Sequence, residues 1–565
     1  MERAVLDRAI EAVRTHRDEW AQLPVAARIA LLRRCMDGYV RVADEVVSLS
    51  CRAKGHDPRS VRSGEEWLSG PVAVVRQIRL FIETLSHIQR TGYPSLARSA
   101  IHRTPTGELA VTVFPRSFFD RVMYPGTRMD VWMQPGVTEA TLRDTMASSY
   151  RSPRPPGSVV VVLGAGNVPS IAPTDALYKM IVEHAVVVLK MHPVNAYLGP
   201  LLERAFEPLI APGYLRIVYG DVDEGQYLVH HPGVDAVHMT GSVAVHDAIV
   251  WGDDRAGSSG LPGRRTPRLT KRITSELGCV TPVIIVPGRW SDEELQYQAE
   301  NIATMVALNA SCLCVAAKLV VTWRGWAQRQ AFLDRVGSVL AMDPPRLAYY
   351  PGAAARYAAF TSRDRANPVE PGGTEQDPAG PRFSCATLFG LDPDDDHPAF
   401  REEAWSPVLA ETALDAATDA SFIEAAVQFC NVRVSGTLSA GVVLSPGTRL
   451  RLRGEVDRAI ASLRYGTISI NQWSAMSFVL GIAPWGAYPG HTLEDVGSGI
   501  GVVHDTLMFG RPLKTVIWGP FTAWPKPPWF ITHRRGHIVA RRIAAFEASP
   551  SAWKLPAIAA AALRW

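Results

Sequence analysis

Two cysteines separated by a single residue are the side chains with the most evident chemical potential in this 565-residue sequence. Cys312 and Cys314 lie in the segment LNASCLCVAAKLVV, where small residues precede a valine-rich run typical of a β-strand. A cysteine near a strand is most often inert packing, but its thiolate is also a nucleophile and a metal ligand. No matching cysteine pair or suitably spaced histidines follow, so the sequence predicts no metal site. Packing and covalent catalysis remain as roles for Cys314.

Polar groups and glycines follow the ends of several predicted strands. Asn167 comes after SVVVVLGAG, at a strand-to-helix turn, where its amide caps the helix or stabilises an oxyanion. Lys190 ends the run AVVVLK, so it is either solvated or placed at the carboxyl edge of a parallel sheet, where ligands bind. Gly241 and Ser242 follow VDAVHMT and open a helix whose free amides can receive a phosphate. Glu276, in ITSELGCVTP, is by itself most simply a surface or capping residue.

Short apolar runs that alternate with amphipathic stretches must position these residues. Predicted strands at 158–163, 185–190, 214–218 and 234–239 are typical of a parallel sheet covered on both faces. The turn after the first of them lacks the third glycine of a dinucleotide fingerprint, because Pro169 stands there. Helical spacing of apolar residues from 4 to about 88 predicts a helical N-terminal layer, and 104–157 predicts a hairpin or connecting strands. The segments 252–272 and 342–398, rich in proline, glycine and charge, are interpreted as loops or insertions.

Composition excludes several classes of protein. The chain is 47% hydrophobic and 20% charged, which is typical of large buried cores and not of a disordered protein. Its 59 basic and 55 acidic residues leave a net charge of +4, so charge gives no reason to expect a nucleic-acid partner. No apolar run approaches the ~20 residues of a membrane span, and the charged start does not resemble a signal peptide. We expect a cytoplasmic protein with no transmembrane segment, whose seven cysteines form no disulfide framework.

The order and spacing of short motifs resemble those of the aldehyde dehydrogenase superfamily over roughly residues 1–518. The matching segments are N-V-P at 167–169, the lysine at 190, M-T-G-S at 239–242, E-L-G-C at 276–279, N-A-S-C-L-C at 309–314, E-E-A-W-S-P-V at 402–408, Y-G-T-I-S-I-N at 465–471, P-W-G-A at 484–487, S-G-I-G at 498–501 and K-T-V-I-W at 514–518. Several matches in register form a much stronger signal than any one of them.

The resemblance implies an α/β fold with a Rossmann-like cofactor domain, an α/β catalytic domain and a β oligomerisation arm. The expected cofactor domain covers 1–275, with the helical layer over 1–90 and the Rossmann-like sheet over 158–275. The expected catalytic domain covers 276–480, and 105–157 and 505–519 are expected to be connecting or oligomerisation strands. The K-T-V-I-W segment looks like the family's oligomerisation strand, which implies a homodimer or homotetramer.

The activity implied by the resemblance is NAD(P)-dependent oxidation of an aldehyde to a carboxylic acid through a cysteine thiohemiacetal and thioester. Cys314 would be the nucleophile, and the Asn167 amide with the backbone N–H of Cys314 would hold the oxyanion. Glu276 would be the general base for the water that hydrolyses the thioester.

The same resemblance assigns five residues to a cofactor, NAD or NADP. Lys190 would hold the adenosine ribose, and Gly241 and Ser242 would contribute to the pyrophosphate region. Glu403 would bind the hydroxyls of the nicotinamide ribose, and Trp405 would lie against that half of the cofactor.

Departures from the family pattern leave alternatives open. Pro193 replaces a carboxylate that disfavours a 2′-phosphate in many members, so NADP stays possible. The step from His192 to Pro193 resembles CoA-acylating members, and AGNVP resembles fatty acyl-CoA reductases, whereas Glu276 favours water over CoA as acyl acceptor. Ser311 and Cys312 replace the family's Gly-Gln, which leaves a non-catalytic cofactor-binding homologue as a further alternative.

The C-terminal extension, residues 520–565, lies outside the resemblance and is unusually rich in tryptophan and arginine. We interpret it as a helix docked on the body of the protein or on a neighbouring subunit, with a membrane-surface helix as the alternative.

Overall fold

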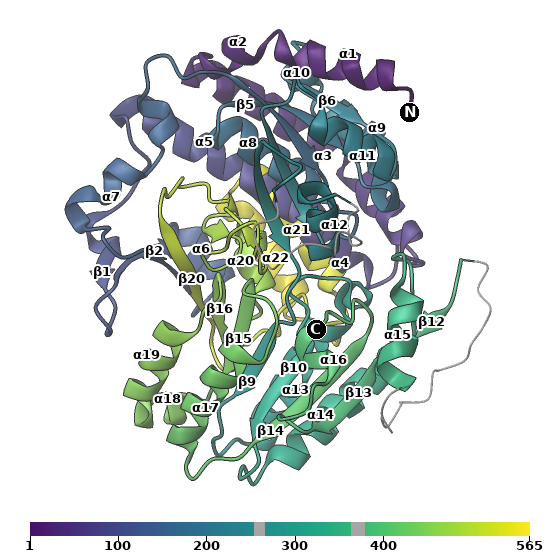
Figure 1. Cartoon of the computed structure of the whole chain (residues 1–565). Helices are drawn as coiled ribbons and strands as arrows, with labels where there is room; N and C mark the ends of the chain where they lie inside the picture. Colours follow the sequence, from purple (N-terminus) through teal and green to yellow (C-terminus); the bar gives the residue numbers. More distant parts are fainter. Residues whose placement is uncertain (253–265, 363–378) are drawn as a thin grey trace.

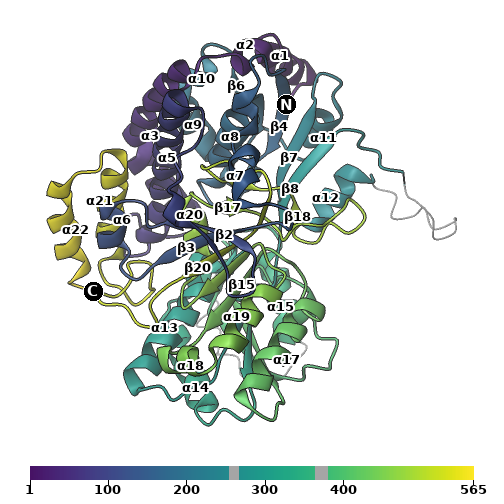
Figure 2. The same cartoon turned by 90° about the vertical axis from the view of Figure 1, so that its left-hand side faces the viewer.

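Two β-sheets, one of six strands and one of ten, form the centre of the molecule (Figure 1). The computed structural model describes residues 1–252, 266–362 and 379–565. Helices cover both sheets, and the two sheets lie in different halves of the molecule, with the N-terminal helices at the end that carries the six-stranded sheet (Figures 1 and 2). The predicted α/β fold is thereby confirmed, whereas the proposed domain boundaries stay a prediction.

The six-stranded sheet has the order β18-β8-β7-β4-β5-β6 and contains all four strands predicted from valine-rich runs. Its members are β4 (Ser158–Leu163), β5 (Ala185–Lys190), β6 (Leu215–Val218), β7 (Ala236–Gly241), β8 (Arg272–Leu277) and β18 (Gly499–Ile500). All pairs are parallel except β18 with β8. Strands β4 and β5 are almost wholly buried, which explains why their sequences are continuous apolar runs without alternation.

Helices pack around this sheet, and those between residues 3 and 91 form the predicted N-terminal layer. Helix α8 (Ile171–Val182) contacts β4 and β5, and α1 (Arg3–Arg14) contacts β4, β5 and β6. Helix α3 (Val25–Ala53) packs on α5 (Ala73–Thr91) and on α9 (Gly199–Ala205). The approach to α9 requires a glycine, because a Cβ on Gly38 would lie 2.4 Å from the carbonyl oxygen of Ala205. Other helices of this half include α2 (Arg17–Ala21), α4 (Ser63–Trp67), α10 (Glu207–Ile210), α11 (Val222–His230) and α12 (Val243–Val250).

The ten-stranded sheet has the order β1-β2-β3-β20-β16-β15-β9-β10-β14-β13. Its strands are β1 (Ile101–Arg103), β2 (Leu109–Phe114), β3 (Arg128–Met133), β9 (Pro282–Ile285), β10 (Leu319–Trp323), β13 (Ala386–Leu391), β14 (Val408–Leu414), β15 (Ser439–Val443), β16 (Thr467–Ile470) and β20 (Pro512–Trp518). The antiparallel pair β2–β3 is the hairpin predicted within 104–157. Neighbouring helices include α13 (Asp292–Ala307), α14 (Arg329–Met342), α17 (Asp419–Val432) and α19 (Arg453–Ser462).

The K-T-V-I-W segment lies in β20, which pairs with β16 on one side and with β3 on the other. Both edges of this strand are therefore occupied within the chain. The predicted homodimer or homotetramer stays a prediction.

The interpretation of 342–398 as loops was wrong in part. The segment contains α15 (Ala353–Ser362), β11 (Arg346–Leu347), β12 (Arg382–Phe383) and the edge strand β13. Strand β13 is an edge strand that pairs with β14. Its short sequence ATLFGL lies between turn-forming residues, so the sequence pattern did not predict a strand there. Residues 363–378 of this segment, and 253–265 of the segment 252–272, lie outside the described residues.

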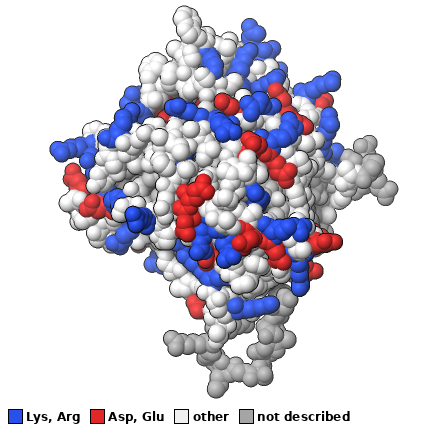
Figure 3. Space-filling view, turned by 90° about the horizontal axis from the view of Figure 1, so that it is seen from above, with Lys and Arg blue, Asp and Glu red and all other residues white. Residues whose placement is uncertain are grey.

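The C-terminal extension is docked on the body of its own chain, as one interpretation of the sequence predicted. Its helix α21 (Gly536–Ala548) packs on α3, α4 and α5, and α22 (Leu555–Ala562) packs on α21 (Figure 2). A buried ion pair fixes this contact, with Arg76 Nη1 2.7 Å from Glu547 Oε1. Lys/Arg and Asp/Glu side chains are interspersed on the face shown in Figure 3. No helix within the described residues has the length and apolarity needed to cross a bilayer.

Candidate active site

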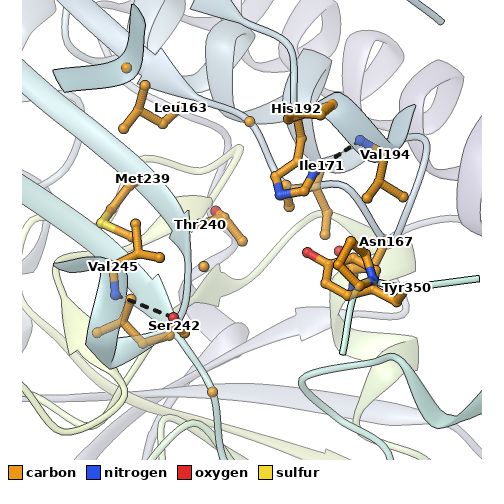
Figure 4. A pocket seen from close by; sticks show the side chains of 18 of the residues that line it. Leu163, Asn167, Ile171, His192, Val194, Met239, Thr240, Ser242, Val245 and Tyr350 are labelled. Atoms are coloured by element: carbon orange, nitrogen blue, oxygen red, sulfur yellow. Dashed lines mark hydrogen bonds between the residues drawn. The ribbon is translucent and has the colours of Figure 1, made fainter. Parts of the chain in front are cut away.

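A cavity of about 560 Å³ lies at the carboxyl ends of β4, β5, β7 and β8. Ligands of parallel α/β sheets bind at this edge. Figure 4 shows part of the lining, with Met239, Thr240, Ser242 and Val245 on one side and Asn167, His192 and Tyr350 on the other. All eight residues that the sequence singled out line this one cavity: Asn167, Lys190, Gly241, Ser242, Glu276, Cys314, Glu403 and Trp405. We call it the polar cavity.

The loop before Cys314 has a left-handed backbone at three consecutive residues. Asn309, Ala310 and Ser311 have φ of 56°, 53° and 60°, a conformation that is costly for residues with a Cβ. Asn309 stabilises it, because its Nδ2 donates to the carbonyl oxygens of Asn167 (3.0 Å) and Cys312 (3.1 Å). The asparagine that begins N-A-S-C-L-C is thus an anchor that ties the cysteine loop to the Asn167 turn.

Asn167 is positioned by the same contacts. Its Nδ2 donates one hydrogen bond to the carbonyl oxygen of Cys312 at 3.0 Å, and its side chain is almost fully buried. A carboxamide nitrogen carries two hydrogens, so one remains for a group in the polar cavity. This is the donor that an oxyanion next to Cys314 requires.

Glu276 and Cys314 interact directly and shift each other's pKa. Burial raises the pKa of Glu276 to about 8, and the charge of Asp175 adds to this effect, while a hydrogen bond with the Cys314 thiol lowers it. Burial also raises the pKa of Cys314 well above its usual value, and the Glu276 carboxylate raises it further. Both groups are therefore neutral over most of the acid and neutral range.

A buried row of polar side chains lies behind Glu276, between α8 and the strands β7 and β8. Asp175 accepts a hydrogen bond from Thr240 Oγ1 at 2.9 Å and lies 3.3 Å from His238 Nε2. Thr240 is paired with Glu276 in the parallel register of β7 and β8, so both side chains are on the same face of the sheet. His238 Nδ1 contacts Thr274 Oγ1 at 3.0 Å. No sequence motif signals this row, because only the register of β7 and β8 and the packing of α8 bring its members together.

Part of the polar cavity is formed by the end of β5 and the start of α11, where the resemblance predicts the adenosine ribose. Burial lowers the pKa of Lys190, whereas the nearby Asp221 and Glu224 charges raise it. The Lys190 side chain packs beside Gly225 of α11, where an added Cβ would lie at an ordinary contact distance of 3.7 Å from Lys190 Cε. Asp221 also lines the cavity, so a carboxylate is present in this region although Pro193 stands at the position where the family pattern has one.

Gly241 and Ser242 lead into α12. The Ser242 hydroxyl accepts a hydrogen bond from the Val245 N–H at 3.3 Å, so this serine caps the helix. The first N–H groups of α12 lie at the cavity edge, which is favourable for a phosphate.

Glu403 and Trp405 form another part of the lining of the polar cavity. Glu403 Oε1 lies 3.2 Å from Lys318 Nζ, and burial raises the carboxyl pKa while Lys318 lowers it. The carboxylate packs over Gly278, where an added Cβ would lie 1.6 Å from Glu403 Oε2. This contact explains the glycine of E-L-G-C. The Trp405 ring stands at 72° to that of Tyr350, with centroids 5.5 Å apart.

Three lining residues, and Asp175 behind the lining, had not been singled out in the sequence. Asp175 acts through Glu276, Asp221 follows β6 at a turn, and Tyr350 and Arg356 lie in the segment interpreted as loops. A carboxylate directly after a predicted strand was the available signal for Asp221. The aromatic pair before Pro351 gave no comparable signal.

The polar cavity fits a dinucleotide. Its lining includes Lys190 beside Asp221, the start of α12 and the carboxylate of Glu403. Two of its buried polar atoms, Trp405 Nε1 and Arg356 Nε, have no hydrogen-bond partner among the described residues. Unsatisfied buried groups of this kind are costly unless a ligand pairs with them.

A second, smaller cavity of about 90 Å³ reaches Cys314 from another direction. Its walls are almost wholly apolar and include Val168, Leu313, Trp473, Met476, Phe478, Trp485 and Trp529. Cys314 and Ile171 line both this apolar cavity and the polar cavity. The indole of Trp473 is fixed by a 2.8 Å hydrogen bond to the carbonyl of Val315, which makes that wall rigid.

Two solved structures have a similar fold and contain a nicotinamide dinucleotide. A solved indole-3-acetaldehyde dehydrogenase in complex with NAD+ has a TM-score of 0.61 at 20% identity, over 91% of this chain and 88% of that one. The NADP-dependent glyceraldehyde-3-phosphate dehydrogenase of Bacillus halodurans, solved with NADP, has a TM-score of 0.60 at 16% identity, over 91% of both chains.

Among curated proteins, the N-succinylglutamate 5-semialdehyde dehydrogenase of Novosphingobium aromaticivorans is 22% identical over 303 residues. That match covers 54% of this chain and 50% of the relative, so it spans about half of the relative's length. The general model of the aldehyde dehydrogenase family matches residues 133–486, which include all eight predicted site residues. The chain therefore belongs to the aldehyde dehydrogenase family.

Proposed function

We propose that the protein oxidises an apolar aldehyde to the corresponding carboxylic acid, with an oxidised nicotinamide dinucleotide as the hydride acceptor. The observation that carries the proposal is the position of Cys314, which lines both the polar cavity and the apolar cavity. A thiol at this junction can bond to a carbonyl carbon that arrives through the apolar cavity while the hydride leaves toward the polar one.

In the first half of the reaction, Cys314 Sγ bonds to the aldehyde carbon and the thiol proton passes to the Glu276 carboxylate. The free N–H of Asn167 and the backbone N–H of Cys314 hold the oxyanion, and one such donor contributes ~3–4 kcal/mol in acyl-transfer enzymes. A bound nicotinamide supplies the acceptor for the hydride. The carbon is then held on Cys314 as a thioester.

Before the second half, Glu276 releases the thiol proton to solvent and is again a carboxylate. It then takes a proton from water while the water oxygen bonds to the thioester carbon, Cys314 departs as a thiolate, and the Glu276 proton restores the thiol. One aldehyde, one oxidised nicotinamide and one water give one acid, one reduced nicotinamide and one proton. A carboxyl pKa of about 8 is well matched to this role, because general bases work best with a pKa near the operating pH.

Water is the proposed acyl acceptor because a buried carboxyl stands beside the nucleophile. His192, the residue that resembles CoA-acylating members, has local partners instead. Its Nδ1 accepts a hydrogen bond from the Val194 N–H at 3.2 Å, and its ring stacks on Tyr350 with centroids 5.8 Å apart. These contacts account for a histidine here without CoA.

NAD is the proposed cofactor in preference to NADP. The observation that supports this choice is Asp221, a carboxylate near Lys190 at the adenosine end of the cavity. A negative charge there repels the 2′-phosphate of NADP, whereas it can accept a hydrogen bond from the 2′-hydroxyl of NAD.

The test is a panel of aldehydes with NAD or NADP, with and without CoA, in which reduced nicotinamide and the acyl product are measured. We expect free acid, and we expect Cys314→Ala to abolish turnover while the matched Cys312→Ala retains it. Acyl-CoA as the product would replace the proposal by the CoA-acylating alternative. Cofactor binding without turnover of any aldehyde would support the alternative that the protein is a non-catalytic cofactor-binding homologue.

A further inference from the structure

The first part of the C-terminal extension is a strap, residues 520–535, that lies along α13. The Ile531 N–H donates to Thr304 Oγ1 at 3.1 Å, and Thr532 Oγ1 donates to Glu300 Oε2 at 2.7 Å. Lys526 Nζ lies 2.6 Å from the same Glu300 oxygen. Since α13 leads directly into the loop of Cys314, the strap is fixed to the support of the nucleophile.

A third cavity, of about 700 Å³, lies between this strap and residues 61–68 and 339–346. We call it the vestibule. Its walls include Met342, which is 65% exposed, and Trp565, which is 46% exposed, so it opens to solvent. The vestibule and the apolar cavity share four wall residues, Glu65, Leu68, Leu308 and Trp529.

The vestibule and the apolar cavity therefore adjoin each other at these four residues. A path from solvent through the vestibule, past Trp529 and along the apolar cavity would end at Cys314. It is separate from the polar cavity except at Cys314 and Ile171, since no other residue lines both. Of the shared residues, Trp529 alone belongs to the C-terminal extension, which lies outside the stretch 133–486 that the family model matches.

We infer that the C-terminal extension forms the outer wall of the aldehyde path, and that Trp529 is a specificity-determining residue for aldehydes with an apolar chain long enough to reach it. This inference rests on the proposed function. The indole of Trp529 separates a wide, partly charged vestibule from a narrow apolar cavity, so it contacts the part of the substrate farthest from the carbonyl. Short aldehydes contact only the part of the apolar cavity around Trp473 and Trp485.

Chain-length dependence tests the inference. The ratio of kcat/KM for decanal to kcat/KM for propanal is measured in the wild type, Trp529→Ala and Trp529→Phe. Loss of an indole that buries apolar area against the chain is expected to lower this ratio by about ten- to a hundredfold in Trp529→Ala. Trp529→Phe is expected to restore most of it, because a second aromatic ring replaces much of the contact.

Trp524→Ala is the matched control, since Trp524 lies in the same strap, is 73% exposed and lines none of the three cavities described here. An unchanged ratio in Trp529→Ala, or an equal fall in Trp524→Ala, overturns the inference. The binding constant for NAD, measured by fluorescence titration, should be the same in all variants. If no aldehyde of any length reduces the nicotinamide in the wild type, the proposed function fails instead, which is a distinguishable result.

Discussion

Replacing Glu276 by glutamine should make the folded protein more stable at alkaline pH. The folded state raises the pKa of this carboxyl from 4.5 to about 8, mainly through burial. A carboxyl whose pKa is raised by folding contributes stability below its unfolded pKa, and that contribution is lost as pH rises through the folded pKa. Glutamine keeps the shape of the protonated carboxyl but does not ionise.

The magnitude follows from the shift. Each pKa unit corresponds to about 1.4 kcal/mol, so ionised Glu276 destabilises the wild type by up to about 5 kcal/mol at high pH. The free energy of unfolding of Glu276→Gln minus that of the wild type should therefore rise by about 4 kcal/mol between pH 5 and pH 9, and level off above pH 8. Urea unfolding followed by tryptophan fluorescence measures this difference.

The rate of turnover of the wild type should rise with pH, whereas its stability should fall. Wild-type activity should rise with pH with a midpoint near 8, because only the carboxylate accepts a proton from water. Glu276→Gln should show at most a first turnover of reduced nicotinamide, with little steady-state rate. A stability difference that does not vary with pH would refute the reasoning, because it would mean that Glu276 is solvated and ionises normally.

Three further substitutions test other parts of the site. Gly278→Ala should raise the KM for NAD about tenfold or more, because the new methyl displaces the Glu403 carboxylate, and a normal cofactor KM would contradict the assigned contact. Asp221→Ser should lower the preference for NAD over NADP by about ten- to a hundredfold, as judged from the two kcat/KM values, since it removes the carboxylate beside Lys190 that lines the cavity and leaves only Glu224 nearby. Asp175→Asn should move the midpoint of the pH–rate profile down by up to about one unit, because a charge that raises the pKa of the catalytic base is removed; an upward shift would exclude that electrostatic role.

The sequence predicted the strands of the six-stranded sheet because burial on both faces requires long apolar runs, and β4 and β5 carry such runs. Strand β13 escaped because it is an edge strand of mixed composition between turn-rich segments. Strand β13 forms because it pairs with β14, and this pairing is not visible in the residues of β13 alone.

The eight site residues were found from motif order, and the structure brings them to one cavity. The buried polar residues behind Glu276 were not predicted, and the reason is physical. Asp175 and His238 come together only through the packing of α8 on β7 and β8, and both look like ordinary polar interruptions in apolar stretches. Only their burial in the structure distinguishes them, because a buried polar group needs partners that compensate its desolvation, and these two residues are partners of each other.

The C-terminal extension shows the same dependence of function on long-range packing. Its helix α21 is held by the buried pair of Arg76 and Glu547, and removing one partner of such a pair costs about 3–5 kcal/mol because the other charge is left uncompensated. The strap before α21 is anchored on α13, the helix that leads into the loop of Cys314. Deleting the extension would therefore disturb fold, aldehyde path and nucleophile together, and loss of activity on truncation would not separate these effects. Point substitutions at Trp529 change the wall of the path and leave both anchors in place, which makes substrate selectivity, and not overall activity, the informative measurement for this part of the chain.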